Sequence, residues 1–203
     1  MNKRIFSSLF LPNIPYEKIY FRLGYPSKEK VLPKQKEQIE ELCQKILKIW
    51  HPQGILATEE VKQFHENGIA TKSLFIPGKE LAKKFEKSKK ITFMAVTVGK
   101  EAMDFRESFK KEQYTNFVLS DAILSELADG LAQSLNNIVQ REAHQQGYHL
   151  TFRFSPGYGD LPLSFQKKLL NFLEGFKIGI SLNNSFLMNP EKSVTALLGW
   201  LKK

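Results

Sequence analysis

One loop of the sequence gathers the residue types that are best suited to bind a ligand. It spans residues 153–162 and reads Arg-Phe-Ser-Pro-Gly-Tyr-Gly-Asp-Leu-Pro. Arg153 offers a planar fork of N–H donors that matches a carboxylate or a phosphate group. Gly157 and Gly159 permit a positive φ or the close approach of a ligand to the backbone, and Tyr158 adds a flat ring with a hydroxyl. Such a loop is either a demanding turn or the cradle of a ligand, and the residue types alone leave both open.

Other residue sets that carry chemistry in proteins are missing or incomplete in this sequence. The histidines are scattered and form no metal-ligand spacing with acids or with the single cysteine; they are His51, His65, His144 and His149. Gly157-Tyr158-Gly159 matches only the start of a dinucleotide-binding fingerprint, because the third glycine is missing. There is no Gly-x-Ser-x-Gly elbow and no Walker loop. The sequence therefore predicts neither a metal site nor a self-contained hydrolase or oxidoreductase.

The composition predicts a single folded domain over residues 1–203, with an irregular N-terminal arm over residues 1–33. Of the 203 residues, 42% are apolar and 12% aromatic, which supplies a core and argues against disorder. The one cysteine, Cys43, excludes an internal disulfide and favours a reducing compartment. No run approaches the roughly 20 apolar residues that span a bilayer, and Pro12 and Pro15 interrupt the N-terminal apolar stretch. We therefore expect a soluble, cytoplasmic protein without a signal peptide.

The formal net charge of +9 bears on partners rather than on the fold. It leaves open nucleic acid, an anionic membrane surface and an acidic protein. The densest basic cluster consists of Lys83, Lys84, Lys87, Lys89 and Lys90. It lacks the arginines and interleaved aromatic residues of a single-strand binding groove. We interpret it as a solvated helix end, which makes nucleic acid the least favoured partner.

Apolar residues at helical spacing predict six helices, over residues 16–23, 34–50, 79–87, 100–110, 116–143 and 164–173. Cys43 falls on the apolar face of the second, where we expect it to pack in the core. The fifth is the longest, and its broad apolar stripe predicts that it packs across a sheet. Gly130 within it indicates close packing against another element or a ligand. Gly99, between a strand and a helix, fits either an anion site or an ordinary turn.

Short runs of β-branched and aromatic residues predict strands over residues 54–61, 73–76, 91–98, 151–154, 179–182, 185–188 and 193–198. Residues 91–98 are almost continuously apolar, as in a central strand that is covered on both faces. The C-terminal strands follow each other too closely for helical crossovers, so antiparallel pairing is expected. The predicted fold class is α+β, with a mixed, largely antiparallel sheet flanked by helices that include one long central helix.

Taken in order, several segments resemble the activation domain of cobalamin-dependent methionine synthase. The most specific are Arg153, Gly157-Tyr158 and Pro162, residues 178–182 (Ile-Gly-Ile-Ser-Leu) and residues 188–194 (Met-Asn-Pro-Glu-Lys-Ser-Val). Upstream, residues 22–25, 95–99 and 127–129 are similar to free-standing members of that family. The resemblance extends over most of the chain.

This resemblance implies a domain that binds S-adenosylmethionine and assists the reductive reactivation of a corrinoid cofactor, cobalamin, carried by a partner protein. The implied partners are a corrinoid-binding methionine synthase, or a related corrinoid methyltransferase, and a flavodoxin-like or other acidic reductase. Arg153 would bind the methionyl carboxylate. Ser155 and Gly157 would present backbone groups to the ligand, and Tyr158 would pack or hydrogen-bond against it.

Two departures from the family pattern limit what the resemblance implies. Gln133, on the long helix that would form a second wall of the ligand site, is the fifth candidate site residue. It stands where the family carries a glutamate, and an amide removes a negative charge that would complement the ligand's cationic groups. The sequence also ends at Lys203, before a tyrosine pair that contributes to the site in the full-length synthase. The expected function is an auxiliary protein without a complete catalytic centre of its own. The alternatives are a scaffold that no longer binds the ligand and a basic nucleic-acid-binding protein.

Overall fold

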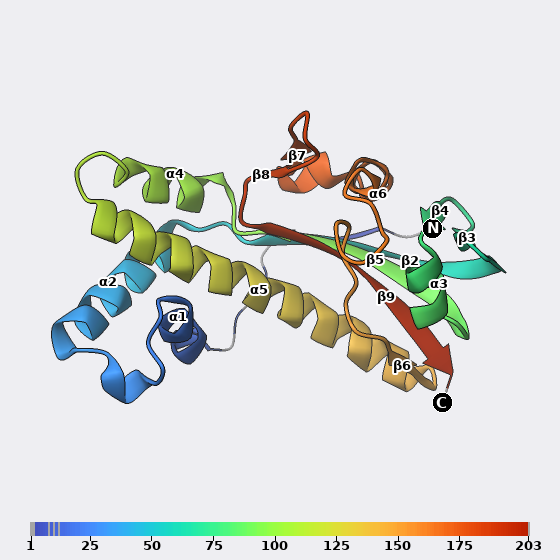
Figure 1. Cartoon of the computed structure of the whole chain (residues 1–203), viewed down its shortest axis with the longest axis horizontal. Coiled ribbons are helices and arrows are strands. Elements are labelled where there is room, and N and C mark those ends of the chain that lie inside the picture. The colour runs from blue at the N-terminus through green and yellow to red at the C-terminus, as the bar shows by residue number, and fades with distance from the viewer. Residues whose placement is uncertain (1–2, 8, 10, 12, 203) are drawn as a thin grey trace.

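The computed structural model describes residues 3–7, 9, 11 and 13–202, in which one twisted sheet is the central element (Figure 1). The strands of this sheet follow the order β4-β3-β2-β5-β9-β6, and β1 pairs with the first part of β2. Every one of these pairs is antiparallel. The strands are β1 (Arg4–Phe6), β2 (Gln53–His65), β3 (Gly68–Thr71), β4 (Phe75–Pro77), β5 (Ser88–Thr97), β6 (Tyr148–Leu150) and β9 (Ser193–Lys202).

β5 is the central strand, as its sequence predicts. It pairs with β2 along one edge and with β9 along the other, and every residue from Ile91 to Thr97 is buried. Side chains alternate between the two faces of a strand, so Phe93 contributes to one core and Met94 to the other. A strand that is covered on both faces has no polar alternation, which explains the apolar run.

Helices cover both faces of the sheet, and their positions agree with the six that the sequence predicts. They are α1 (Tyr16–Arg22), α2 (Pro33–Ile49), α3 (Lys79–Lys84), α4 (Lys100–Ser108), α5 (Tyr114–Gln145) and α6 (Phe165–Leu173). In Figure 1, α5 crosses one face of the sheet with α1, α2 and α4 beside it, while α6 lies on the opposite face. The α+β prediction, with one long helix packed on a largely antiparallel sheet, is confirmed.

Two glycines and the cysteine have structural explanations. A Cβ on Gly130 would lie 3.1 Å from Leu11 Cδ2, so this glycine lets the N-terminal segment pack closely on α5. Gly99 has a φ of +91°, and a Cβ there would lie 3.0 Å from the carbonyl oxygen of His51, which fits the ordinary-turn interpretation. Cys43 is buried in the core, as predicted, and burial raises the pKa of its thiol to about 12.

Several predicted strands are wrong or shifted. Residues 151–154 form no strand; β6 comes before them, and only Phe154 makes an isolated bridge, to Leu197. Residues 179–182 begin after a 3₁₀ helix (Gly175–Ile178), and the short strands β7 (Ser181–Leu182) and β8 (Met188–Asn189) form a separate hairpin. In place of one strand at residues 73–76 there is the β3–β4 hairpin.

The first 33 residues hold more structure than an irregular arm. Besides α1 they contain a second 3₁₀ helix (Lys28–Lys30) and β1, which pairs with residues 54–56 of β2. None of the helices in the described part of the chain combines the length and the apolar character needed to cross a membrane.

Candidate ligand site at the edge of the sheet

A cleft of about 900 Å³ lies where the loop of residues 151–160 passes along the outer edge of β9. Ligand sites commonly have volumes of about 300–1,000 Å³. The cleft is lined by parts of α3, α5, α6, the β7–β8 hairpin, the start of β9 and the loop itself. Because α5 and α6 pack on opposite faces of the sheet, the cleft extends around the edge of β9.

Backbone hydrogen bonds fix the loop against β9. The Thr151 N–H donates to the Gly199 carbonyl at 2.9 Å, and the Phe154 N–H donates to the Leu197 carbonyl at 3.0 Å. Farther along, the Ser155 hydroxyl donates to the Thr195 carbonyl at 2.7 Å. The loop thus occupies the place of a strand without forming a continuous ladder. Ser155, Pro156 and Tyr158 line the cleft.

The glycines of the loop make a tight turn. Gly157 has a φ of +91°, and its N–H donates to the Leu161 carbonyl at 2.8 Å. Gly159 has a φ of +53°, and a Cβ there would lie 2.8 Å from Glu80 Oε2. Gly157 is outside the lining, whereas the Tyr158 ring is 69% exposed at the cleft. The loop is therefore a demanding turn whose side chains also border a cleft.

Asp160 anchors α3 beside the loop. Its Oδ2 accepts the Glu80 N–H at 2.6 Å and its Oδ1 accepts the Leu81 N–H at 3.2 Å, as a side-chain cap does at the first turn of a helix. Burial raises the pKa of Asp160, but the backbone N–H groups together lower it by more, so it lies below its usual value. This contact brings Glu80 and Lys84 of α3 to the cleft.

One of the two terminal nitrogens of the Arg153 guanidinium is paired within the described part of the protein, and the other is not. Its Nη2 lies 2.9 Å from Asp129 Oδ1, while Nη1 is buried and has no acceptor among the described residues. A buried donor without an acceptor costs about 1–3 kcal/mol. Arg153 therefore keeps one donor that pairs with no group in the described part of the chain.

The long helix brings Asp129 to the cleft and leaves Gln133 outside it. Gln133 is exposed, donates to Asn137 Oδ1 at 2.9 Å and borders a neighbouring depression, which it shares with Arg153. Asp129, one turn earlier on the same face of α5, lines the cleft itself. Asp129 is not among the site residues predicted from the sequence, although its spacing of four from Gln133 places both on one side of the helix.

A buried polar pair lies on the α6 side of the cleft. The Thr195 hydroxyl donates to Gln166 Oε1 at 2.9 Å, and both residues are buried and line the cleft. Gln166 was not predicted from the sequence as a site residue either, because a polar residue in a short amphipathic helix is usually exposed to solvent.

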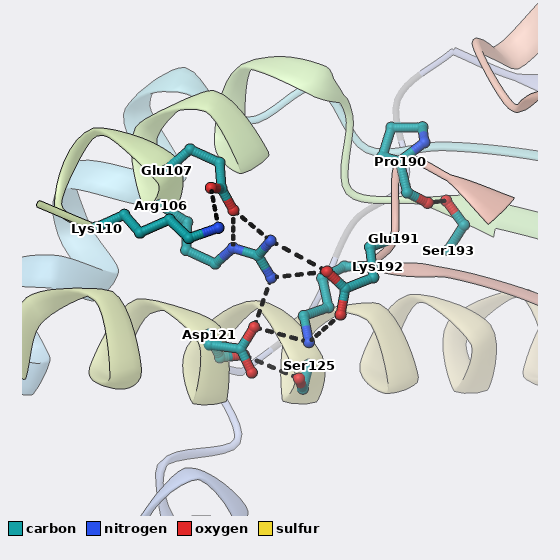
Figure 2. Close-up of polar contacts among 9 residues, drawn as sticks. All are labelled: Arg106, Glu107, Lys110, Asp121, Ser125, Pro190, Glu191, Lys192 and Ser193. Atoms are coloured by element: carbon teal, nitrogen blue, oxygen red, sulfur yellow. Dashed lines mark hydrogen bonds and ion pairs between the residues drawn. The ribbon is translucent and has the colours of Figure 1, made fainter. Parts of the chain in front are cut away.

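A charged network fixes the residues that lead into β9 (Figure 2). The Arg106 side chain, only 8% exposed, donates to Asp121 Oδ1 at 2.5 Å and to Glu191 Oε2 at 3.1 Å. Lys192 Nζ lies 2.9 Å from the same oxygen of Asp121. Burial raises the pKa of Asp121, but Lys192 and Arg106 together lower it by more, so this pKa lies below its usual value. The network joins α4, α5 and residues 191–192, which directly precede the cleft-lining residues of β9.

These observations define a class of protein: an α+β domain with a preformed small-molecule cleft at the open edge of an antiparallel sheet. The cleft contains paired charges and hydrogen-bonding groups. In the described part of the chain no three His, Cys, Asp or Glu side chains lie together as metal ligands. Clefts of this size, with a few polar groups in a largely apolar lining, are common places for small ligands in proteins.

The chain belongs to the family described as the activation domain of vitamin B12 dependent methionine synthase, whose model matches residues 75–201. Methionine synthase of Mycobacterium tuberculosis (strain ATCC 25618 / H37Rv) is 26% identical over an alignment 144 residues long, which covers 61% of this chain and 12% of that protein. The chain therefore spans a small part of this curated relative.

A solved structure described as the MetH reactivation domain bound to AdoHcy has the same fold. Its TM-score is 0.75 at 17% sequence identity, and the match covers 98% of this chain and 78% of that one. The cleft-lining residues of α3, α5, α6 and the loop all lie within the segment that matches the family.

Proposed function

We propose that this protein binds S-adenosylmethionine in the cleft and assists the reductive methylation of a corrinoid held by a partner protein. The partner would be methionine synthase or a related corrinoid methyltransferase. The observation that carries the proposal is the partly unpaired guanidinium of Arg153: the residue lines the cleft, and its Nη1 has no acceptor among the described residues. Membership of the activation-domain family and the AdoHcy bound to the structural neighbour support this ligand class.

The charges of the cleft are complementary to the amino-acid part of this ligand. Its carboxylate would accept from Arg153 Nη1, as a charge-assisted hydrogen bond. Its ammonium and sulfonium groups would lie near the acids that line the cleft, Asp129 and Glu80. Each charged group of the ligand thus has an opposite charge within the same cleft.

The other predicted site residues have supporting roles in this proposal. The Tyr158 ring packs or hydrogen-bonds against the ligand, and Ser155 presents its backbone beside Arg153. Gly157 turns the chain that carries Tyr158, because its own N–H is already bonded to the Leu161 carbonyl. Gln133 contacts only the part of a ligand that reaches the neighbouring depression.

The protein would contribute positioning rather than acid–base chemistry. A corrinoid held by the partner and reduced by one electron from a donor would supply the acceptor for the methyl group of the sulfonium, and S-adenosylhomocysteine would remain. Arg153 and Asp129 hold the amino-acid end of the ligand, so that the methyl group faces the partner. Fixing two reactants in this way lowers the entropic barrier of the transfer.

The proposed docking face for the partner is the rim of the cleft. Phe152 is 96% exposed and Leu187 is 54% exposed, and both border the cleft together with Tyr158. Apolar side chains that surround a ligand site favour a protein partner that covers them. The net charge of +9 suits an acidic reductase of the flavodoxin type through long-range attraction. We place this assembly in the cytoplasm.

Calorimetric titration of the purified protein with S-adenosylmethionine tests the proposal. We expect saturable binding of one ligand, and tighter binding when a corrinoid protein is present. Absence of binding under both conditions would overturn the ligand assignment. Capture of a corrinoid protein in that case would favour the second candidate, a scaffold, for which the Arg153–Asp129 ion pair would be purely structural.

A further inference from the structure

Gln166 has a hydrogen-bonding capacity that the protein does not use. It is the second residue of α6 and is 2% exposed, and its Oε1 accepts the Thr195 hydroxyl. A primary amide carries two further donors on its nitrogen. For Nε2 we find no acceptor among the described residues, and the residue lines the cleft. Although the residue as a whole is buried, Nε2 is not among the buried polar atoms that lack a partner, so its unused donors are open to the cleft.

The amide is held in place by a short chain of hydrogen bonds. Thr195 is itself buried, and its carbonyl accepts the Ser155 hydroxyl at 2.7 Å. Ser155 is two residues from Arg153 in the same loop. The two cleft donors, Arg153 Nη1 and Gln166 Nε2, are thus fixed by one connected set of residues before any ligand binds.

The surroundings of Gln166 differ from those of Arg153. Arg153 and Asp129 form an ion pair on the α5 side of the sheet edge. Beside α6, the cleft lining includes the apolar side chains of Leu163, Phe186 and Met188. A ligand with a charged amino-acid end and a flat base would place the charged end at Arg153 and the base beside α6. Ring nitrogens and hydroxyl oxygens of a nucleoside accept hydrogen bonds.

We infer that Gln166 is a specificity-determining residue, whose side-chain N–H donates to an acceptor in the nucleoside part of the ligand. This inference rests on the proposed function and extends it from the carboxylate to the other end of the ligand. Arg153 then selects for the amino acid and Gln166 for the nucleoside.

The first test compares Gln166→Glu with wild type at pH 8. Glutamate keeps the shape and the acceptor for Thr195 but presents an oxygen where the N–H donors were. We expect its affinity for S-adenosylmethionine and for adenosine to fall by about tenfold or more. Binding of methionine alone should not change. Gln145→Glu, an exposed substitution on α5, controls for the added charge.

The second test uses only the wild-type protein, so it does not depend on whether a variant folds. In the wild-type protein, adenosine analogues that each lack one acceptor (a deaza ring position or a deoxy sugar position) are titrated in turn. We expect one analogue to lose about tenfold in affinity. A series without any loss would overturn the inference.

The outcomes separate the two proposals. If the wild type fails to bind S-adenosylmethionine, the proposed function fails and the inference falls with it. Wild-type binding that Gln166→Glu leaves unchanged or strengthens overturns the inference alone. If Gln166→Glu lost equal affinity for adenosine and for methionine, the inference would also be overturned, because equal losses indicate a general disturbance of the cleft.

Discussion

Arg153 Nη2 and Asp129 Oδ1 lie 2.9 Å apart, and this ion pair joins the loop to the long helix across the open edge of β9. The pair leaves Nη1 of the same guanidinium without an acceptor among the described residues. Arg153 therefore pairs with a carboxylate of the protein itself through one nitrogen, and a second nitrogen has no partner in the part of the chain that the structure describes. That this second nitrogen binds a ligand stays a prediction.

Replacing Arg153 with alanine should weaken S-adenosylmethionine binding by about 2–4 kcal/mol, because a charge-assisted hydrogen bond to the carboxylate is lost. The free energy of unfolding should fall by only about 1 kcal/mol, since Asp129 is half exposed and water screens the pair in part. Calorimetric dissociation constants and thermal unfolding measure the two effects. Arg141→Ala, an exposed arginine of α5, is the matched control. An unchanged dissociation constant for Arg153→Ala would refute the carboxylate contact.

Asp129 and Gln133 provide a second comparison, one helical turn apart. Asp129→Asn keeps the shape of the side chain and removes the charge at the cleft, so we expect roughly a tenfold loss of affinity, about 1.4 kcal/mol. Gln133→Ala should change affinity by less than a factor of about 3, because Gln133 borders only the neighbouring depression. A larger loss of affinity for Gln133→Ala in the same titration would indicate that the ligand binds in the neighbouring depression rather than in the cleft.

The long, periodic elements were predictable from the sequence because their burial is regular. The predicted helix at residues 116–143 corresponds to α5, and the apolar run at residues 91–98 corresponds to β5. Residues 151–154 were not predictable as a loop, because their β-favouring residues do pair with β9. That pairing stops after isolated contacts, and Phe152 points to solvent.

The candidate site was predictable only where its residues are unusual for their local structure. A loop with Arg153 and two glycines stands out, whereas Asp129 and Gln166 lie in amphipathic helices where polar residues normally face water. Only the packing of α5 and α6 around the edge of β9 brings these two residues to the loop. Composition and periodicity do not contain that information.

Two glycines with positive φ should differ in how much stability is lost when they are replaced with alanine. Gly159 lies in the tight turn of the loop, and Gly147 lies between α5 and β6. Gly147→Ala, with no other atoms within 4 Å of the new Cβ, should cost about 1–2 kcal/mol from backbone strain alone. Gly159→Ala adds close contacts with Glu80 Oε2 at 2.8 Å and with the Phe154 ring at 3.2 Å. The exposed Glu80 side chain can rotate away, but the buried Phe154 ring must shift, so we expect a loss up to about 1 kcal/mol larger. Urea unfolding of the two variants measures the difference, and equal losses would show that the loop relaxes freely.

The charged network of Figure 2 predicts how stability depends on pH. Arg106 and Lys192 hold the pKa of Asp121 below its usual value of 3.8, against the effect of burial. A carboxylate with a lowered pKa in the folded state contributes stability above its unfolded pKa and loses it as pH falls through the folded value. Asp121→Asn should therefore lower the free energy of unfolding at pH 7, by about 1–2 kcal/mol. The difference from wild type should narrow below about pH 3.8.

Urea unfolding at pH 7 and at pH 3 tests this dependence on protonation. Asp104→Asn is the matched control, because its partner Lys100 is exposed and an exposed i,i+4 pair contributes about 0.3–0.5 kcal/mol. We expect the control to change stability little at either pH. A constant difference between Asp121→Asn and wild type over the whole range would mean that the Asp121 charge does not stabilise the fold. The Arg106 network would then hold the start of β9 by hydrogen bonding and packing alone.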